Sequence, residues 1–348
     1  MGLLIQSDLG RAAMHRSIRI LTLSLAGTLL LAACATREDA GRADASRLSK
    51  LPPVVSPADN PTTADKVALG ARLWIDPRLS GSGKTACTTC HVREKGWTDG
   101  QVLSRRDNGD MNTRHSPTMY NVGYSSQFYW DGRAPTLEAQ VLAAWRVQIS
   151  ADPAKATAII AGVPGYASEF QKVFGGPPTQ ESIVKALAAY LRAKVSGLSP
   201  WDRHEMNERN AVSEDAKAGF VLFMGKGRCA VCHTPPNYTD FNFHNIGLEA
   251  GKPKPDLGRG TVTKKPEDNS AFKTPTLRSV AISGPHFHDG SRKTLEEAVR
   301  YMAGGGGTDP NKSANLIDTK LSDSEIRQMV AFLATLTSDE PYKAPSLP

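Results

Sequence analysis

Cys87-Thr88-Thr89-Cys90-His91 and Cys229-Ala230-Val231-Cys232-His233 contain four of the 5 cysteines of this 348-residue chain. The spacing C-x-x-C-H is typical of c-type haem attachment, in which two thiols bind the haem vinyl groups and the histidine ligates the iron. A zinc site fits less well, because the two pairs are much further apart in the chain than zinc ligands usually are. A redox C-x-x-C does not need a histidine after it, yet both motifs of this chain have one. The sequence therefore predicts two covalent haems, bound by Cys87, Cys90, His91, Cys229, Cys232 and His233.

The overall composition is that of a folded globular protein. The chain is 40% hydrophobic and 22% charged, which excludes a collagenous or wholly disordered protein. Five cysteines in this length also exclude a small disulfide-rich scaffold. The formal net charge of +7 is too mild to indicate nucleic-acid binding, and no nucleic-acid partner is expected.

The fifth cysteine, Cys34, lies at the end of an export signal. Arg16 and Arg19 flank the start of an apolar run, 18–31, and Ala32-Ala33 precede Cys34. The run is too short for a membrane span, and Cys at the cleavage point is typical of a bacterial lipoprotein. We expect 1–33 to be a signal peptide and Cys34 to carry lipid; an ordinary secretory signal is the alternative. The protein is then periplasmic, anchored by lipid to the outer membrane, with 34–60 as a polar tether.

The body of the chain repeats itself. Ser116-Pro117-Thr118-Met119 matches Thr274-Pro275-Thr276-Leu277, and in both halves an Asp-Gly pair follows the proline at the same offset, at Asp131 and at Asp289. Each C-x-x-C-H also follows a Gly-x-x-Leu-aromatic stretch. These repeats predict an internal duplication with two haem domains, at 61–205 and 206–348.

The local patterns indicate helices. Residues 182–195 and 322–336 carry apolar stripes with helical spacing, and no useful run alternates with the period of a strand. The segment 237–270 is rich in Gly, Pro and Asn, so we expect a long loop that wraps a haem. The predicted fold class is all-α, with two cytochrome c-like domains.

The chain resembles the bacterial dihaem cytochrome c peroxidase/MauG family. The similarity rests on the two C-x-x-C-H motifs, on Phe128-Tyr129-Trp130-Asp131-Gly132-Arg133-Ala134, and on the segment from Phe272 to Gly290. It covers about residues 61–340. It implies a peroxidatic haem in the first half and an electron-transfer haem in the second.

The duplication supports this division independently. Met302 lies thirteen residues after Asp289, where the resemblance places an axial ligand, and the matching residue after Asp131 is Ala144. Alanine cannot ligate iron. We therefore expect His233 and Met302 to ligate the second iron, whereas the first has only His91.

Three residues depart from the family pattern. Asp107 stands where peroxidases that need reductive activation carry a displaceable histidine, so the first haem is expected to be open without prior reduction. Gln148 aligns with the acid/base glutamate and, as an amide, hydrogen-bonds peroxide without shuttling its proton. His115 replaces an asparagine that ligates calcium between the haems, and histidine is a poor ligand for this hard ion, which argues against calcium.

The resemblance also implies roles for residues near the haems. Trp130 matches a tryptophan that relays electrons between the haems, with a buried packing role as the alternative. Gln140 matches a glutamine near the reactive haem, with a position on the helix surface as the alternative. Arg133 and Arg278 are candidates for pairing with haem propionates, or with Asp. We interpret His204, His244 and His286 as structural or solvated.

Three functions are consistent with these features. The first is an exported peroxidase that reduces H2O2 to water with electrons from a small periplasmic cytochrome c or copper protein. The second is a MauG/MbnH-like enzyme that uses peroxide to oxidise a residue of a partner protein. The third is a dihaem electron carrier without enzyme activity, which Ala144 disfavours because a carrier gains nothing from an open haem.

Overall fold

The computed structural model describes residues 51–338, 340 and 342–348, and Leu51–Pro348 form one compact unit. The predicted signal peptide, Cys34 and most of the predicted tether lie outside the described residues. The last part of that tether, 51–60, belongs to the folded unit, because the buried Asn60 donates hydrogen bonds to Glu138 and to the carbonyl of Lys185. Within the described residues, no helix is long and apolar enough to cross a bilayer.

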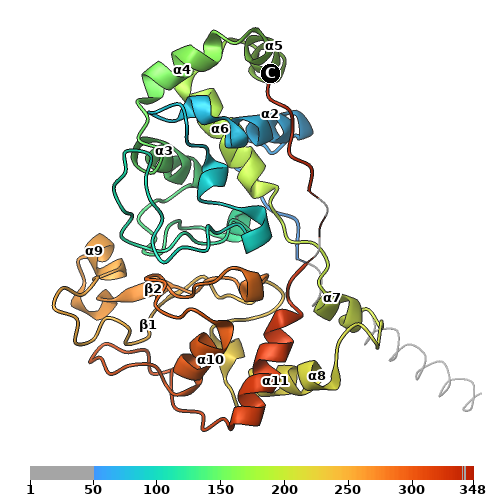
Figure 1. Ribbon diagram of the computed structural model, residues 1–348, viewed down its shortest axis with the longest axis vertical. Coiled ribbons are helices and arrows are strands. Elements are labelled where there is room, and N and C mark those ends of the chain that lie inside the picture. Colours follow the sequence, from blue (N-terminus) through green and yellow to red (C-terminus); the bar gives the residue numbers. More distant parts are fainter. Residues whose placement is uncertain (1–50, 339, 341) are drawn as a thin grey trace, which may run out of the picture. The chain divides into compact units, whose positions relative to one another are not determined.

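The described chain is mostly helical (Figure 1). The expectation of a purely α-helical protein was wrong in one respect, because two short strands pair as an antiparallel sheet. The helices are α2 (Ala64–Ile75), α3 (Leu137–Val147), α4 (Pro153–Ala161), α5 (Pro164–Phe174), α6 (Gln180–Arg192), α7 (Pro200–Glu205), α8 (Glu214–Met224), α9 (Arg259–Thr263), α10 (Leu295–Ala303) and α11 (Asp323–Ala334), and the strands are β1 (Phe243–Asn245) and β2 (Ala271–Lys273).

The first core forms around α2 and α6, which lie side by side (Figure 1). Helix α6 starts at its cap Thr179 and ends at Arg192, so it begins and ends slightly earlier than the apolar stripe predicts. The two helices approach closely at Gly70, where a Cβ would overlap the carbonyl oxygen of Ala186. Glycine therefore sets the spacing on which this core depends.

The second core forms around α8 and α11 in the same manner. Helix α11 begins after its cap Ser322, as expected, and ends at Ala334. A Cβ at Gly219 of α8 would overlap the carbonyl oxygen of Gln328 in α11. Both Gly-x-x-Leu-aromatic stretches thus lie in helices at close helix contacts.

The predicted long loop 237–270 is not wholly irregular, because it contains β1, α9 and a 3₁₀ turn, Pro266–Asp268. In the sheet, Phe243 pairs with Lys273 and Asn245 with Ala271. The pairing holds the end of β2 beside the first half of the chain, where the backbone N–H of Lys273 donates to the carbonyl of Trp130 at 2.8 Å.

Candidate functional site

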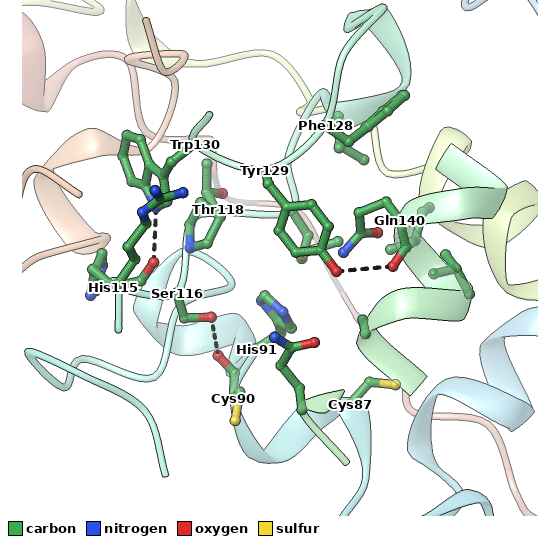
Figure 2. A pocket seen from close by; sticks show the side chains of 18 of the residues that line it. Cys87, Cys90, His91, His115, Ser116, Thr118, Phe128, Tyr129, Trp130 and Gln140 are labelled. Carbon is green, nitrogen blue, oxygen red and sulfur yellow. Dashed lines mark hydrogen bonds between the residues drawn. The ribbon is translucent and has the colours of Figure 1, made fainter. Parts of the chain in front are cut away.

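The first C-x-x-C-H forms a tight turn at the wall of a cavity. Cys87–Thr89 make a 3₁₀ turn, and the N–H groups of Cys90 and His91 donate to the carbonyl of Cys87 at 3.2 and 3.1 Å. Both sulfurs and the imidazole thereby face one cavity of about 290 Å³, which Figure 2 shows. Burial raises the pKa of the Cys87 thiol to about 12 and that of Cys90 to about 11. These thiols are protonated at neutral pH, which disfavours thiolate redox chemistry.

The ring of His91 is held in one orientation. Its Nδ1 lies 2.9 Å from the carbonyl oxygen of Trp97, so Nδ1 carries the proton and Nε2 is left free. Burial lowers the pKa of His91, which keeps the imidazole neutral. A neutral ring with one oriented nitrogen is the form that ligates iron.

The second C-x-x-C-H repeats this geometry. Cys229–Val231 form a 3₁₀ turn, the N–H of His233 donates to the carbonyl of Cys229 at 2.9 Å, and His233 Nδ1 lies 2.9 Å from the carbonyl oxygen of Tyr238. Cys229, Cys232 and His233 line a second cavity of about 230 Å³. Because each cysteine pair faces its own cavity, the four sulfurs do not form one zinc site.

The two cavities differ on the side contributed by the helix after the Asp-Gly turn. Ala144 of α3 lines the first cavity, and Met302 of α10 lines the second. The second cavity therefore has a thioether among its lining side chains as well as His233. At the corresponding position of the first cavity, α3 offers only the methyl group of Ala144.

Trp130 and His115 line both cavities. The indole Nε1 of Trp130 donates to the carbonyl of His115 at 2.9 Å (Figure 2). The buried His115 is held by its Nδ1, 2.8 Å from the carbonyl oxygen of Gln101, and burial lowers its pKa. The site therefore consists of two C-x-x-C-H cavities with an indole between them.

Comparison with known proteins agrees with this geometry. The family model described as di-haem cytochrome c peroxidase matches residues 64–210. The chain is 37% identical to cytochrome-c peroxidase IdrP1 of Denitromonas iodatirespirans, over 96% of each protein. It is 40% identical to methylamine utilization protein MauG of Methylorubrum extorquens, over 82% of each. The chain belongs to the dihaem cytochrome c peroxidase/MauG family. It is therefore a cytochrome-c peroxidase-like oxidoreductase.

A solved structure of the dihaem family supports the fold. A MauG-like protein associated with microbial copper homeostasis has 30% sequence identity and a TM-score of 0.77, covering 83% of this chain and 94% of that one. The family implies two haems, and both cavities fit that group. Each presents two thiols and a neutral, oriented imidazole, and the first also holds a polar atom without a protein partner, described next.

Gln148 and Gln140 both face the first cavity of this dihaem peroxidase. Gln148 follows the last residue of α3, and its Oε1 is buried with no hydrogen-bond partner among the described residues. Gln140 lies one helical turn before Ala144, and its backbone carbonyl accepts the Tyr129 hydroxyl at 3.2 Å (Figure 2). The Gln148 side chain therefore offers the cavity a buried acceptor that no described residue occupies.

Asp107 lies outside the lining of either cavity. Its carboxylate accepts the N–H and the hydroxyl of Ser82 at 2.9 and 2.5 Å, and its own N–H donates to the carbonyl of Gln148 at 3.0 Å. Asp107 thus connects the loop before the first haem motif to the end of α3. Asp107 therefore holds Ser82 and Gln148 in place and does not face the cavity.

The structure places Arg133 and Arg278, the two candidates for pairing with haem propionates, in different environments. Arg133 lines the first cavity, with its Nη1 3.0 Å from Asp131 and its guanidinium 3.6 Å from the centre of the Tyr129 ring. Arg278 lines neither cavity; it is buried and pairs with Asp202 of α7 at 2.6 Å. The structure therefore brings only Arg133 to a haem cavity.

Sequence reasoning missed three residues at the cavities. Lys273 lines both, donates to the Ser125 hydroxyl at 2.9 Å, and has its pKa lowered by burial to about 8. His244 and His286, interpreted as structural or solvated, line the second cavity. Lys273 lies in the segment that carries the family resemblance, and its position there was the available signal.

Proposed function

We propose that this protein is an exported dihaem c-type peroxidase that reduces H2O2 to water with electrons from a small periplasmic redox protein. The observation that carries the proposal is the difference between Ala144 and Met302. Ala144 and His91 line the first cavity, so the helix position after the Asp-Gly turn supplies no ligand there, whereas the thioether of Met302 and His233 line the second. One cavity then suits reaction with peroxide and the other suits electron transfer.

The haem expected on Cys87 and Cys90 would supply an iron that accepts the oxidising equivalents of peroxide. Around this haem, residues of the chain would orient the peroxide. The free Oε1 of Gln148 accepts a hydrogen bond from a peroxide O–H, but the amide does not take up the proton. Ala144 keeps the adjacent wall free of side-chain ligands, and two electrons and two protons complete the conversion of H2O2 to two molecules of water.

Electrons would enter from the second cavity. Trp130 lines both cavities, and its indole is hydrogen-bonded to His115, which also lines both. We propose that Trp130 relays electrons between the two sites. The position of Asp107 outside the cavity supports an open first haem without prior reduction.

Local geometry supports the proposal of an internal duplication. Tyr129 and Phe287 both have a left-handed backbone, with φ of 67° and 72°. The β-bridge between Phe128 and Ala134 has a counterpart between His286 and Arg292. We propose two haem domains; because Trp201 packs in the second core, we place their boundary before α7 and not after it, at 205/206, as the sequence analysis expects.

Calcium is not part of the proposal. His115 stands at the ligand position that the family resemblance implies, and an imidazole is a poor ligand for this hard ion. For localisation, we propose the periplasmic side of the outer membrane, through a lipid on Cys34.

A second candidate is MauG/MbnH-like oxidation of a residue in a partner protein. Two observations favour it: Gln148 in place of a proton-shuttling carboxylate, and 40% identity to a MauG protein. A non-enzymatic electron carrier fits less well, because the first cavity lacks an opposing ligand from α3 and the chain belongs to a peroxidase family.

Steady-state consumption of H2O2 by the haem-loaded protein tests these functions. The peroxidase proposal predicts turnover with a reduced small cytochrome c. Peroxide-dependent oxidation of an added protein without cytochrome turnover would support the second candidate. A protein that consumes no peroxide in either assay would contradict both.

A further inference from the structure

A row of aromatic rings leads away from the His91 side of the first cavity. The Trp74 ring lies 5.5 Å from the His91 ring and 5.8 Å from the Tyr190 ring, measured between centroids. Trp74 also lines the first cavity, and both Trp74 and Tyr190 are buried. This row involves neither Trp130 nor the second cavity.

The row ends at the C-terminal segment, near Lys194. The Nζ of Lys194 lies 4.4 Å from the centre of the Tyr190 ring, 4.9 Å from that of Tyr342 and 4.7 Å from that of Trp97. Tyr342 also packs edge-on against Trp97 at 5.4 Å. Tyr342 is only half-buried, so the row reaches from the cavity to the protein surface.

The polar atoms of this cluster are unusual for a protein core. Trp74 Nε1, Trp97 Nε1, Tyr190 OH and Tyr342 OH are all buried, and none makes a hydrogen bond of ordinary length to a described residue; the hydroxyls of Tyr190 and Tyr342 lie near each other. Buried Trp and Tyr normally find partners for these groups. By contrast, Trp145, which lines the same cavity, donates its Nε1 to the carbonyl of Leu79 at 2.8 Å.

We propose that Trp74, Tyr190 and Tyr342 form a second exit for oxidising equivalents, which carries them from the His91 haem to the C-terminal segment when no electron donor is present. The inference rests on the proposed peroxide reaction. One electron moves from the Tyr190 and Tyr342 pair through Trp74 to the oxidised haem site. The phenolic O–H bond breaks, and the proton passes to the amine of Lys194 once this flexible side chain turns from the ring faces, where its Nζ lies, to the hydroxyl. A neutral tyrosyl radical remains for an external reductant.

The charge of Lys194 explains why a tyrosine holds the oxidising equivalent. When Lys194 is an ammonium, an oxidised indole at Trp97 that kept its proton would be a second cation beside it, which is unfavourable. When Lys194 is an amine, it takes up the proton of the phenol. A phenol that has lost an electron and a proton is neutral. Burial raises the pKa of Tyr190, so the phenol keeps its proton until it is oxidised.

Lys194 has a suitable environment for accepting that proton. Burial lowers its pKa to about 8, so part of the population is a neutral amine near neutral pH. The charged groups that face it are Glu340, which favours the ammonium form, and Arg93, which opposes it. The yield of radical should therefore rise as pH increases through about 8.

The test is electron paramagnetic resonance of the haem-loaded protein, frozen shortly after mixing with H2O2 in the absence of donor. We expect a tyrosyl signal that narrows in protein made with ring-deuterated tyrosine. Tyr190→Phe/Tyr342→Phe and Trp74→Phe should lose it. Trp145→Phe, in the same cavity, and Tyr124→Phe, whose hydroxyl donates to the Pro52 carbonyl at 2.6 Å, should keep it.

Two further measurements separate this inference from the proposed function. Haem absorbance after mixing shows whether peroxide reacts at all; no change there would contradict the proposed function. A normal absorbance change with an undiminished tyrosyl signal in the double variant would overturn the exit route. Lys194→Arg retains the charge but cannot accept a proton, so it should lose the rise with pH. A rise that persists in this variant would overturn the role of Lys194.

Discussion

The indole Nε1 of Trp130 donates a 2.9 Å hydrogen bond to the carbonyl of His115 between the two haem cavities. The backbone N–H of His115 in turn donates to the carbonyl of His288 at 2.7 Å, and His288 lines the second cavity. Trp130 is thus connected by hydrogen bonds and one residue of backbone to the opposite half of the chain. This connection is the route that we propose for electronic coupling between the sites.

Trp130→Phe should uncouple the two haems. The phenyl ring keeps the packing but cannot donate to His115, and it is much harder to oxidise than indole. In stopped-flow absorbance, peroxide should still oxidise the first haem, whereas oxidation of the second should slow greatly and donor turnover should fall. Trp145→Phe is the matched control and should leave both phases unchanged. Equal rates in Trp130→Phe and the parent protein would leave Trp130 with a packing role only.

Met302→Leu should remove the sixth ligand of the second haem while retaining side-chain volume. A thioether stabilises ferrous iron, so its loss should lower the midpoint potential of that haem and abolish any thioether-to-iron absorption band. Met329 also lines the second cavity, and Met329→Leu is the control that should keep both properties. The assignment fails if Met329→Leu, and not Met302→Leu, changes the spectrum.

The first haem should be high-spin in the oxidised protein as isolated, because Ala144 supplies no ligand. An electron paramagnetic resonance spectrum of the isolated protein with only low-spin haem would refute the open site.

Gln148→Glu should increase the rate of reaction with peroxide, since general acid–base groups contribute about 10² to 10⁴-fold. That increase should grow as pH rises through the pKa of the new carboxyl, because the base is its ionised form. Gln148→Ala should slow the reaction.

Two haems should remain attached after denaturation. Intact-mass measurement of the haem-loaded protein should give the polypeptide plus two haem masses, since thioether bonds survive unfolding. Cys229→Ser/Cys232→Ser should retain one. Loss of both haems from the unfolded parent protein would show that attachment is not covalent.

Asp202→Ala should destabilise the protein through Arg278. Both side chains are buried, and the guanidinium pairs with the carboxylate at 2.6 Å. Breaking a buried ion pair costs about 3 to 5 kcal/mol of unfolding free energy, because the remaining charge is left uncompensated. Urea unfolding monitored by tryptophan fluorescence measures the change. Lys172→Ala, which loses a largely exposed pair with Asp65, should change stability little.

The sequence by itself determined the features that depend on local spacing. The two C-x-x-C-H motifs required tight turns with a histidine at their end, and both turns are present because the spacing between cysteines allows little else. Helical periodicity predicted α6 and α11 to within a few residues. The equal offsets of Ala144 and Met302 from their Asp-Gly turns predicted which side of each cavity they line. Each of these features follows from contacts between residues close in the chain.

The tertiary structure alone decided which distant residues share a cavity. Arg278 and Arg133 were equivalent candidates in the sequence, yet a carboxylate in α7 holds Arg278 in the core, and only Arg133 lines a cavity. Lys273 reaches both cavities because β1 pairs with β2, and strands this short carry no readable alternation. Tyr342 approaches Lys194 only because the C-terminal segment returns to the first half. Long-range pairing depends on the summed packing of the whole chain, and no local pattern encodes it.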